Sequence, residues 1–331
     1  MCGPVIPDNP LAVALIKGLA GVAILISFVS LNVLFLVWFE RKVIARIQVR
    51  YGPNRAGKFG LLQPLADTIK LMVKEDIIPE KADRAVFTLA PAAAFGVALL
   101  PTVAIPFASG LIVSDLNVGI LYIVAVSSLA TIPVIMGGWG SNNKYALLGG
   151  MRAVAQSISY EIPLVLSIIG VVALTGSLST VQIVDAQTNI WYVFLQPIGF
   201  MVFFVAGIAE MSRLPFDLPE SESELVAGFH TEYSGMKFAM FLFAEYIHMV
   251  VASALMVVLF FGGWNIPFMT IPFIAQVVVF IGKMYIIISI LIWIRATLPR
   301  VTIVQMTAIG WKVLIPLALL NIAITGVFMM L

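Results

Sequence analysis

The chain has 331 residues, of which 61% are hydrophobic and only 11% are charged at neutral pH. Soluble domains carry about 25% charged residues, so the composition excludes an ordinary soluble domain. Apolar runs of about 20 residues recur, and each is long enough to cross a hydrocarbon core of about 30 Å. The short alternating segments of an outer-membrane barrel are not found. We therefore expect an all-α polytopic membrane protein.

We expect eight transmembrane helices in this chain. Hydropathy places them at about residues 11–39, 85–107, 118–136, 153–174, 191–209, 238–261, 273–294 and 313–330. The longest polar segment, 40–84, follows the first span, and an acidic segment, 210–237, follows the fifth. We treat residues 1–331 as a single membrane domain with these two loops. The glycine-rich sequence 137–150, which follows the third span, is interpreted as a loop with a tight cytoplasmic turn.

The distribution of basic residues predicts the orientation of the chain. Lys and Arg accumulate in cytoplasmic loops, and 17 of the 19 here lie after the first, third, fifth and seventh spans. The exceptions are Lys17 and Lys283, and the alternate loops carry only Asp115 and Asp185. This pattern predicts cytoplasmic large loops and, with eight spans, termini on the non-cytoplasmic side. The start of the sequence lacks a basic leader and a small-residue cleavage site, so we expect no removed signal peptide.

The loop 40–84 predicts an amphipathic helix along the cytoplasmic interface. Apolar side chains recur at spacings of three and four, and charged side chains take the other face: Leu62, Leu65, Ile69 and Met72 against Asp67, Lys70 and Lys74. Pro64 suits the first helical turn. The alternative interpretation of this helix is that its charged face is simply solvated and has no further role. For the basic residues at 41–55, the alternative is anchoring at the membrane surface.

Ionisable side chains within the spans are the most informative feature. A charge at mid-bilayer costs roughly 2.5–3.5 kcal/mol on insertion scales, so such groups face the protein interior and mark ion or proton paths. The candidates are Glu161, Glu210, Glu245, His248 and Lys283. Glu245 and His248 are three residues apart and share a helix face. The alternative is static, with Lys283 neutralising one glutamate and locking two helices together.

The stretch 210–233 holds a concentration of carboxylates: Glu210, Asp217, Glu220, Glu222, Glu224 and Glu232. Crowded carboxylates raise one another's pKa, which favours groups able to exchange protons near neutral pH. A solvated acidic loop is the alternative. However, large apolar residues are interleaved with the acids, so we expect the loop to fold against the rest of the protein. Pro215 and Pro219 oppose regular helix from 211 to 219.

Several kinds of site are excluded by residue counts and motifs. One cysteine, Cys2, and two histidines cannot build an iron–sulfur cluster, a zinc site or a bis-haem site. No Walker loop, dinucleotide fingerprint or nucleophile–base pair is found. We therefore expect no metal, haem or iron–sulfur cofactor and no nucleic-acid partner. If the function is redox-linked, the redox centres must lie on other subunits.

Two long motifs resemble a known family. They are WFERKVIARIQVRYGPNRAGKFGLLQPLADTIKLMVKED at 38–76 and RLPFDLPESESELVAGFHTEYSGMKF at 213–238. Both closely resemble the membrane subunit of respiratory complex I that lies at the junction of its two arms, which is the H subunit in bacteria and subunit 1 in mitochondria. The likeness covers nearly the whole chain, including the eight spans.

The resemblance implies a subunit of a proton-pumping NADH–quinone oxidoreductase in an energy-transducing membrane, the inner membrane of a bacterium. Quinone is then the substrate, and this chain holds no complete active site. The implied partners are peripheral iron–sulfur and quinone-site subunits, small membrane subunits, antiporter-like subunits and the lipid bilayer.

The resemblance also implies roles for individual residues. Those that match the family's quinone cavity are Glu40, Arg41, Asp67, Lys70, Arg213, Asp217 and Arg295. Those that match its acidic, proton-coupling path are Glu161, Glu210, Glu220, Glu222, Glu224, Glu232 and Glu245.

Three other functions stay open on the sequence. A subunit of an energy-converting hydrogenase or formate-linked complex would couple its redox reaction to ion transport without a quinone. A stand-alone ion transporter is disfavoured because no internal repeat is evident. A purely structural anchor for a peripheral enzyme would not need the acidic side chains within the spans.

Overall fold

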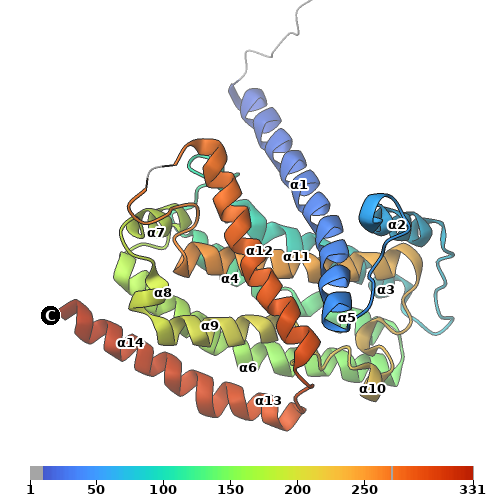
Figure 1. The fold of residues 1–331 in the computed structure, drawn as a ribbon. Coiled ribbons are helices and arrows are strands. Elements are labelled where there is room, and N and C mark those ends of the chain that lie inside the picture. The colour runs from blue at the N-terminus through green and yellow to red at the C-terminus, as the bar shows by residue number, and fades with distance from the viewer. Residues whose placement is uncertain (1–9, 270, 331) are drawn as a thin grey trace, which may run out of the picture.

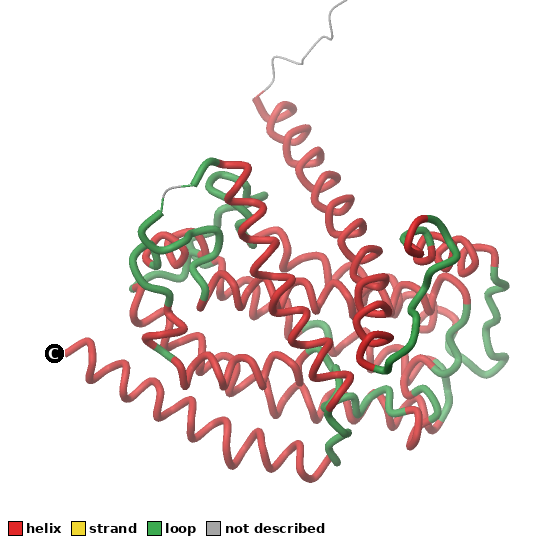
Figure 2. The backbone as a smooth tube through the Cα atoms, in the orientation of Figure 1, coloured by secondary structure: helices red, strands yellow, loops and turns green. Residues whose placement is uncertain are grey.

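The computed structural model describes residues 10–269 and 271–330, and Figures 1 and 2 show helices and loops over this part of the chain. Cys2 lies outside it, as do the side chains of residues 10–17, 19, 20, 222 and 223. The helices are α1 Pro10–Ile47, α2 Gln63–Val73, α3 Arg84–Leu99, α4 Gly119–Ser128, α5 Thr131–Gly140, α6 Lys144–Thr175, α7 Thr180–Ala186, α8 Tyr192–Leu195, α9 Pro197–Glu210, α10 Glu222–Leu225, α11 Gly235–Phe260, α12 Phe273–Thr297, α13 Ile303–Ile309 and α14 Ile315–Met330. A π-helical turn, Gly310–Leu314, joins α13 to α14.

Within the described residues, seven helical segments are long and apolar enough to cross a membrane: Gly21–Ile47, Arg84–Ala104, Gly119–Gly140, Lys144–Thr175, Gly235–Phe260, Phe273–Thr297 and Ile303–Met330. They correspond to seven of the eight predicted spans, and the all-helical fold class is confirmed. The predicted span 191–209 is divided into α8 and α9 at Gln196, where the backbone leaves the helical region. The count of eight therefore stays a prediction.

Helix α11 forms the core of the bundle. Of its most apolar window, 72% is buried, whereas the value for Ile303–Met330 is 22%. A helix that is hydrophobic all round is expected to be enclosed by its neighbours. In Figure 1, α14 lies along one edge of the molecule and α1 extends away from the bundle. The exposed apolar faces of α1, α12 and α14 are of the kind that lipid or neighbouring membrane subunits cover.

The glycine-rich segment 137–150 is mostly helical, so its interpretation as a loop was wrong. Helix α5 ends at Gly140 and α6 begins at Lys144, where the Asn143 side chain accepts a hydrogen bond from the Tyr145 amide. At Gly138, a Cβ atom would lie 2.5 Å from the carbonyl oxygen of Ala146. The glycines therefore allow α5 and α6 to approach closely rather than making a long turn.

Lys283 pairs with no glutamate whose side chain the structure describes, contrary to the static alternative. Its Nζ atom donates to the carbonyl oxygens of Phe261, Gly263 and Asn265 at 2.8, 2.9 and 2.6 Å. The ammonium group also lies 4.6 Å from the centre of the Trp191 ring. Carbonyls at a helix C-terminus lack intrahelical donors, and a cation there complements the helix dipole. Lys283 therefore locks α12 to the end of α11 through backbone oxygens.

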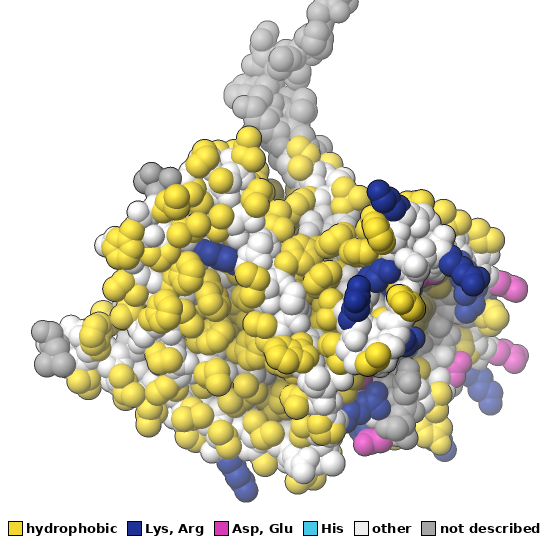
Figure 3. All heavy atoms as spheres, viewed as in Figure 1, with side chains coloured by type: hydrophobic (Ala, Val, Ile, Leu, Met, Phe, Trp, Pro, Cys, Tyr) yellow, Lys and Arg dark blue, Asp and Glu magenta, His cyan; other side chains and the backbone are white. Residues whose placement is uncertain are grey.

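Charged side chains gather on one side of the molecule. Figure 3 shows blue and magenta spheres concentrated over the side where α2 and α10 lie, with a largely apolar surface elsewhere in this view. A helix, α2, forms in this loop, and its apolar side chains Leu65, Ile69 and Met72 are exposed, so its amphipathic role stays a prediction. Its position at a membrane interface remains a prediction.

Candidate functional site

The acidic loop between α9 and α11 is packed against the bundle. Phe216, Leu218 and Phe229 are buried, and the Phe216 ring lies 5.3 Å from that of Tyr160 on α6. Residues 211–221 are not helical, as the two prolines predict. Val226 is the exception to the burial, with 62% of its surface exposed. The expectation that this loop folds against the protein is confirmed.

Backbone contact holds the same loop on α6. At Gly149, a Cβ atom would lie 2.7 Å from the amide nitrogen of Phe229 and 2.9 Å from the carbonyl oxygen of Pro219. These separations are shorter than any ordinary contact of a Cβ atom, so a side chain at 149 would displace the loop. A glycine on α6 therefore brings the loop within backbone distance of the helix.

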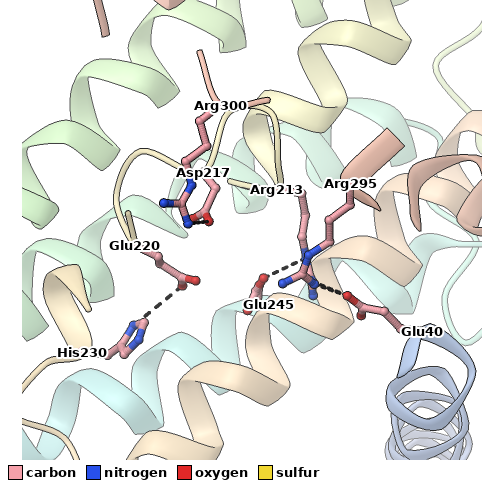
Figure 4. Close-up of polar contacts among 8 residues, drawn as sticks. All are labelled: Glu40, Arg213, Asp217, Glu220, His230, Glu245, Arg295 and Arg300. Atoms are coloured by element: carbon pink, nitrogen blue, oxygen red, sulfur yellow. Dashed lines mark hydrogen bonds and ion pairs between the residues drawn. The ribbon is translucent and has the colours of Figure 1, made fainter. Parts of the chain in front are cut away.

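Arg213 joins carboxylates from two helices (Figure 4). Its Nη1 atom lies 3.3 Å from Oε1 of Glu40 on α1, and its Nε atom lies 2.8 Å from Oε1 of Glu245 on α11. Glu40 also pairs with Arg295 on α12. The guanidinium of Arg213 lies 4.6 Å from the centre of the Tyr246 ring. The cluster of Glu40, Arg213, Glu245 and Arg295 thus connects the acidic loop to α1, α11 and α12.

Burial and charge oppose each other at Arg213. Arg213 and Glu40 are buried, with 6% and 3% of their surfaces exposed. Burial alone lowers the pKa of the guanidinium, but the carboxylates of Glu245 and Glu40 outweigh it, and the pKa is raised overall. Arg213 therefore stays charged, and its carboxylate partners offset the cost of removing that charge from water.

A second group of ionisable side chains lies beside this cluster (Figure 4). Asp217 Oδ2 accepts a hydrogen bond from Arg300 Nη2 at 3.3 Å, and His230 Nδ1 lies 3.8 Å from Glu220 Oε1. Burial raises the pKa of Asp217 to about 6, against the opposing effect of Arg300. Burial, then the charges of Glu245 and Asp217, raise the pKa of Glu220. Burial lowers the pKa of His230 to about 4, so the imidazole is neutral at physiological pH.

A cavity of about 150 Å³ lies next to the charged groups and is lined by carboxylates from four elements. They are Glu161 on α6, Glu210 on α9, Glu220 in the loop and Glu245 on α11. His248 also lines it, so Glu245 and His248 share a face as predicted. Among the described residues that line it, none is Lys or Arg. Within the described residues, no three His, Cys, Asp or Glu side chains are arranged to hold a metal ion.

Other predicted site residues lie away from this cavity. Arg41 and Asp67 form a half-exposed ion pair of 2.5 Å between α1 and α2, and Lys70 is exposed. Glu224 pairs with Arg152 on α6, and Glu232 accepts a hydrogen bond from Asn143. The last two carboxylates fasten the loop to the start of α6. The side chain of Glu222 lies outside the described part of the structure.

Sequence reasoning missed Arg300, Gln156 and the pairing of His230. Arg300 was counted as a loop cation, but it lies beside Asp217, 83 residues away in the sequence. Gln156 is a polar side chain within a predicted span, which is a usable signal because uncharged polar groups are also costly there. The proximity of His230 to Glu220 had no signal in the sequence, because the chain between them forms the short helix α10 and then turns back at residues 226–227.

The profile of the NADH dehydrogenase family matches residues 20–326 of the chain. The chain belongs to this family. Curated proteins named as the H subunit of NADH-quinone oxidoreductase are similar to it over nearly its whole length. The protein from Dehalococcoides mccartyi (strain CBDB1) is 55% identical over 303 residues, which are 92% of this chain and 84% of that protein. The Geobacillus sp. (strain WCH70) protein is 52% identical over 310 residues, covering 93% and 92% of the two chains.

Proposed function

We propose that this chain is the membrane subunit of an NADH–quinone oxidoreductase that forms part of the quinone-binding cavity and couples quinone reduction to proton translocation. Membership of the NADH dehydrogenase family over residues 20–326 supports this. So do the names of relatives that are 52–55% identical to the chain. These names favour a quinone-linked enzyme over a hydrogenase-type complex or a stand-alone transporter.

The observation that carries the proposal is that Glu245 belongs to two sites. Its carboxylate pairs with Arg213 in the buried ion-pair cluster and also lines the acidic cavity. Reduction of a quinone to a quinol takes up two electrons and two protons, so the charge beside the cluster changes when the electrons arrive before the protons. Movement of Arg213 away from Glu245 would leave that carboxylate without its positive partner at the edge of the cavity. Glu245 thereby transmits the event at the quinone to Glu161, Glu210 and Glu220.

The two charged segments have separate roles in this proposal. Segment 40–84, with Arg41, Asp67 and Lys70, flanks the quinone passage and faces the peripheral subunits, which carry the redox centres. Segment 210–237 forms the wall between that passage and the acidic cavity, with Arg213 and Asp217 on the quinone side. Glu222, Glu224 and Glu232 belong to the same acidic path. Both segments lie on the cytoplasmic side of a bacterial inner membrane, with both termini opposite.

The test is to replace Glu245 and Glu210 separately by Gln in the assembled complex, reconstituted in vesicles. Quinone reduction and vesicle acidification are measured in parallel. We expect Glu245→Gln to impair both and Glu210→Gln to lower proton translocation more than electron transfer. The control is Asp185→Asn, which removes an exposed carboxylate from α7. Full retention of both activities in Glu245→Gln and Glu210→Gln would refute the coupling role.

A further inference from the structure

Gln156 is a buried amide at the edge of the acidic cavity. It lies on α6, little more than one helical turn before Glu161, and only 1% of its surface is exposed. Its Nε2 atom donates to the carbonyl oxygens of Ala209 and Phe216, at 2.6 and 2.8 Å. Both neighbours of this atom are acceptors, so it must be the amide nitrogen, and the other atom must be the oxygen.

The two carbonyl groups that Gln156 binds belong to the residues immediately before two acids. Ala209 precedes Glu210 at the end of α9, and Phe216 precedes Asp217 in the acidic loop. A single amide on α6 therefore holds both backbones that carry these carboxylates. The Phe216 ring, packed against Tyr160 one turn further along α6, supports the same loop segment.

The remaining atom of the amide, Oε1, is buried and accepts no hydrogen bond from any described residue. Gln156 lines the cavity together with Glu161, Glu210, Glu220, Glu245 and His248. An amide oxygen is only an acceptor, so its partner must bring a proton. Buried polar atoms are nearly always satisfied, by protein groups or by water. A water molecule or a protonated carboxyl group meets this requirement, whereas a carboxylate does not.

We propose that Gln156 is a positioning residue for proton transfer in the acidic cavity. Its amide nitrogen fixes Glu210 relative to the loop acids, and its oxygen holds a proton-bearing group, either water or a neutral carboxyl, among them. This inference rests on the proposed coupling function. It predicts that changing Gln156 affects the ratio of protons translocated to electrons transferred, beyond any effect on stability.

Gln187 provides a matched control. It is also fully buried, and its Nε2 atom donates to carbonyl oxygens of α7 and α11, at Ile183, Val258 and Leu259. Its Oε1 atom accepts from the Tyr192 and Gly262 amides, and it does not line the acidic cavity. Replacing either glutamine by Met removes comparable bonds to backbone carbonyls at similar side-chain volume.

The experiment compares Gln156→Met, Gln156→Glu and Gln187→Met in the whole complex, reconstituted in vesicles. Thermal stability, quinone reduction and proton translocation are measured from pH 6 to pH 8. We expect both Met variants to lose stability. Only Gln156→Met should also lower the proton-to-electron ratio, with coupled turnover reduced roughly 10- to 100-fold, as misplacement of reacting groups typically does.

Gln156→Glu adds a pH dependence of coupled turnover, which would not change if Gln156 had only a structural role. A protonated carboxyl group has the shape of the amide and can donate one hydrogen bond, whereas a carboxylate donates none. The titratable groups that line the same cavity are its four carboxylates and His248, and Asp217 follows Phe216, whose carbonyl oxygen Gln156 binds. Relative to wild type at each pH, coupled turnover of this variant should be low at pH 8 and recover towards pH 6. Gln156→Met should show no such recovery.

Each outcome decides a separate question. If Gln156→Met matches Gln187→Met in stability and keeps the wild-type proton-to-electron ratio, the inference about Gln156 is overturned. The same holds if Gln156→Glu shows no recovery at low pH. The coupling function itself would still stand if Glu210→Gln lowers proton translocation in the same vesicles. If neither Glu210→Gln nor Glu245→Gln has any effect, the proposed function fails instead.

Discussion

Arg213 is the side chain on which the buried charge cluster depends. It stands between Glu40 and Glu245, and it is supplied by a loop rather than by a helix. Removing one partner of a buried ion pair leaves an uncompensated charge in a poorly solvated site. The position of Arg213 therefore sets the electrostatic state of residues on α1 and α11 together.

Arg213→Gln should lower the free energy of unfolding by about 3–5 kcal/mol, because two carboxylates lose a buried partner. Thermal unfolding of the purified complex measures the loss. Adding Glu40→Gln to Arg213→Gln should recover part of it. Arg41→Gln is the control, since Arg41 is half-exposed and its pair with Asp67 contributes about 0–1 kcal/mol. Equal losses for the two arginine variants would contradict this assignment.

Asp217 should titrate near neutral pH. The folded protein binds its proton more tightly than the unfolded chain, because burial raises the pKa from 3.8 to about 6. Its contribution to stability is therefore greatest below pH 3.8 and is lost as the pH rises through about 6. An infrared titration of protonated carboxyl groups should lose a component with a midpoint near 6 in Asp217→Asn. An unchanged titration would show that Asp217 is ionised throughout.

Part of the charged site was predictable at this scale. The resemblance to the family assigned Glu40, Arg213 and Arg295 to the quinone cavity, and the structure brings these three side chains together. Helical spacing alone placed Glu245 and His248 on one face, and both line the cavity. The pair Asp217–Arg300 depends on the path of a non-helical segment, and the pair Glu220–His230 depends on the turns on either side of the short helix α10. Periodicity carries no information about such a path.

At the scale of elements, the contact between α6 and the acidic loop is the determining feature. Gly149 permits backbone contact with the segment around Phe229, and Gln156 binds Phe216 further along the same helix. The loop therefore has two anchors on one rigid element. Movement of the start of α6 would carry the loop acids with it.

Gly149→Ala should displace the acidic loop, because the new methyl group would lie 2.7 Å from the Phe229 amide nitrogen. Gly150→Ala is its matched control, since the nearest atoms there are 3.5 Å away, an ordinary contact. Both changes favour helix by about 1 kcal/mol, so Gly150→Ala should keep or slightly raise stability. Gly149→Ala should instead increase proteolytic cleavage within residues 211–234. Equal cleavage of both variants would contradict the close contact.

Hydropathy predicted the existence of most helices but not all of their ends. Helix α6 begins at Lys144, nine residues before the predicted start at 153, because Gly149 and Gly150 lie within the helix, where they face the acidic loop and α5, and do not form a turn. Helical glycines of this kind read as turn signals in an isolated sequence. The break at Gln196 was missed for the opposite reason, since the apolar run continues on both sides of it.

At the scale of the whole molecule, charge and apolar surface are separated. Charged side chains cover the side with α2 and the acidic loop (Figure 3), and this polarity matches the predicted placement of the basic loops. This separation predicts which side of the protein faces the cytoplasm. The loops of α7 and of α10 should therefore lie on opposite sides.

Cysteine labelling tests this orientation. Ala186→Cys and Val226→Cys, each in a Cys2→Ser background, place a thiol at exposed positions in the α7 and acidic loops. In membrane vesicles of known orientation, a membrane-impermeant maleimide should label the two from opposite faces, with Val226→Cys labelled from the cytoplasmic side. Because partner subunits are expected to cover the acidic loop, the peripheral subunits are first dissociated. Labelling of both from one face would refute the topology.

As the helix of the predicted fifth span, α9 would shorten the path over which the membrane potential falls. Its 14 residues span about 21 Å, less than the hydrocarbon core of about 30 Å. The acidic cavity lies at its Glu210 end, and water entering it would replace part of the insulating layer there. A voltage applied across the membrane would then fall over a shorter path, giving a steeper local field. A proton gained or lost at Glu210 would do more electrical work per ångström moved than one crossing an unbroken bilayer.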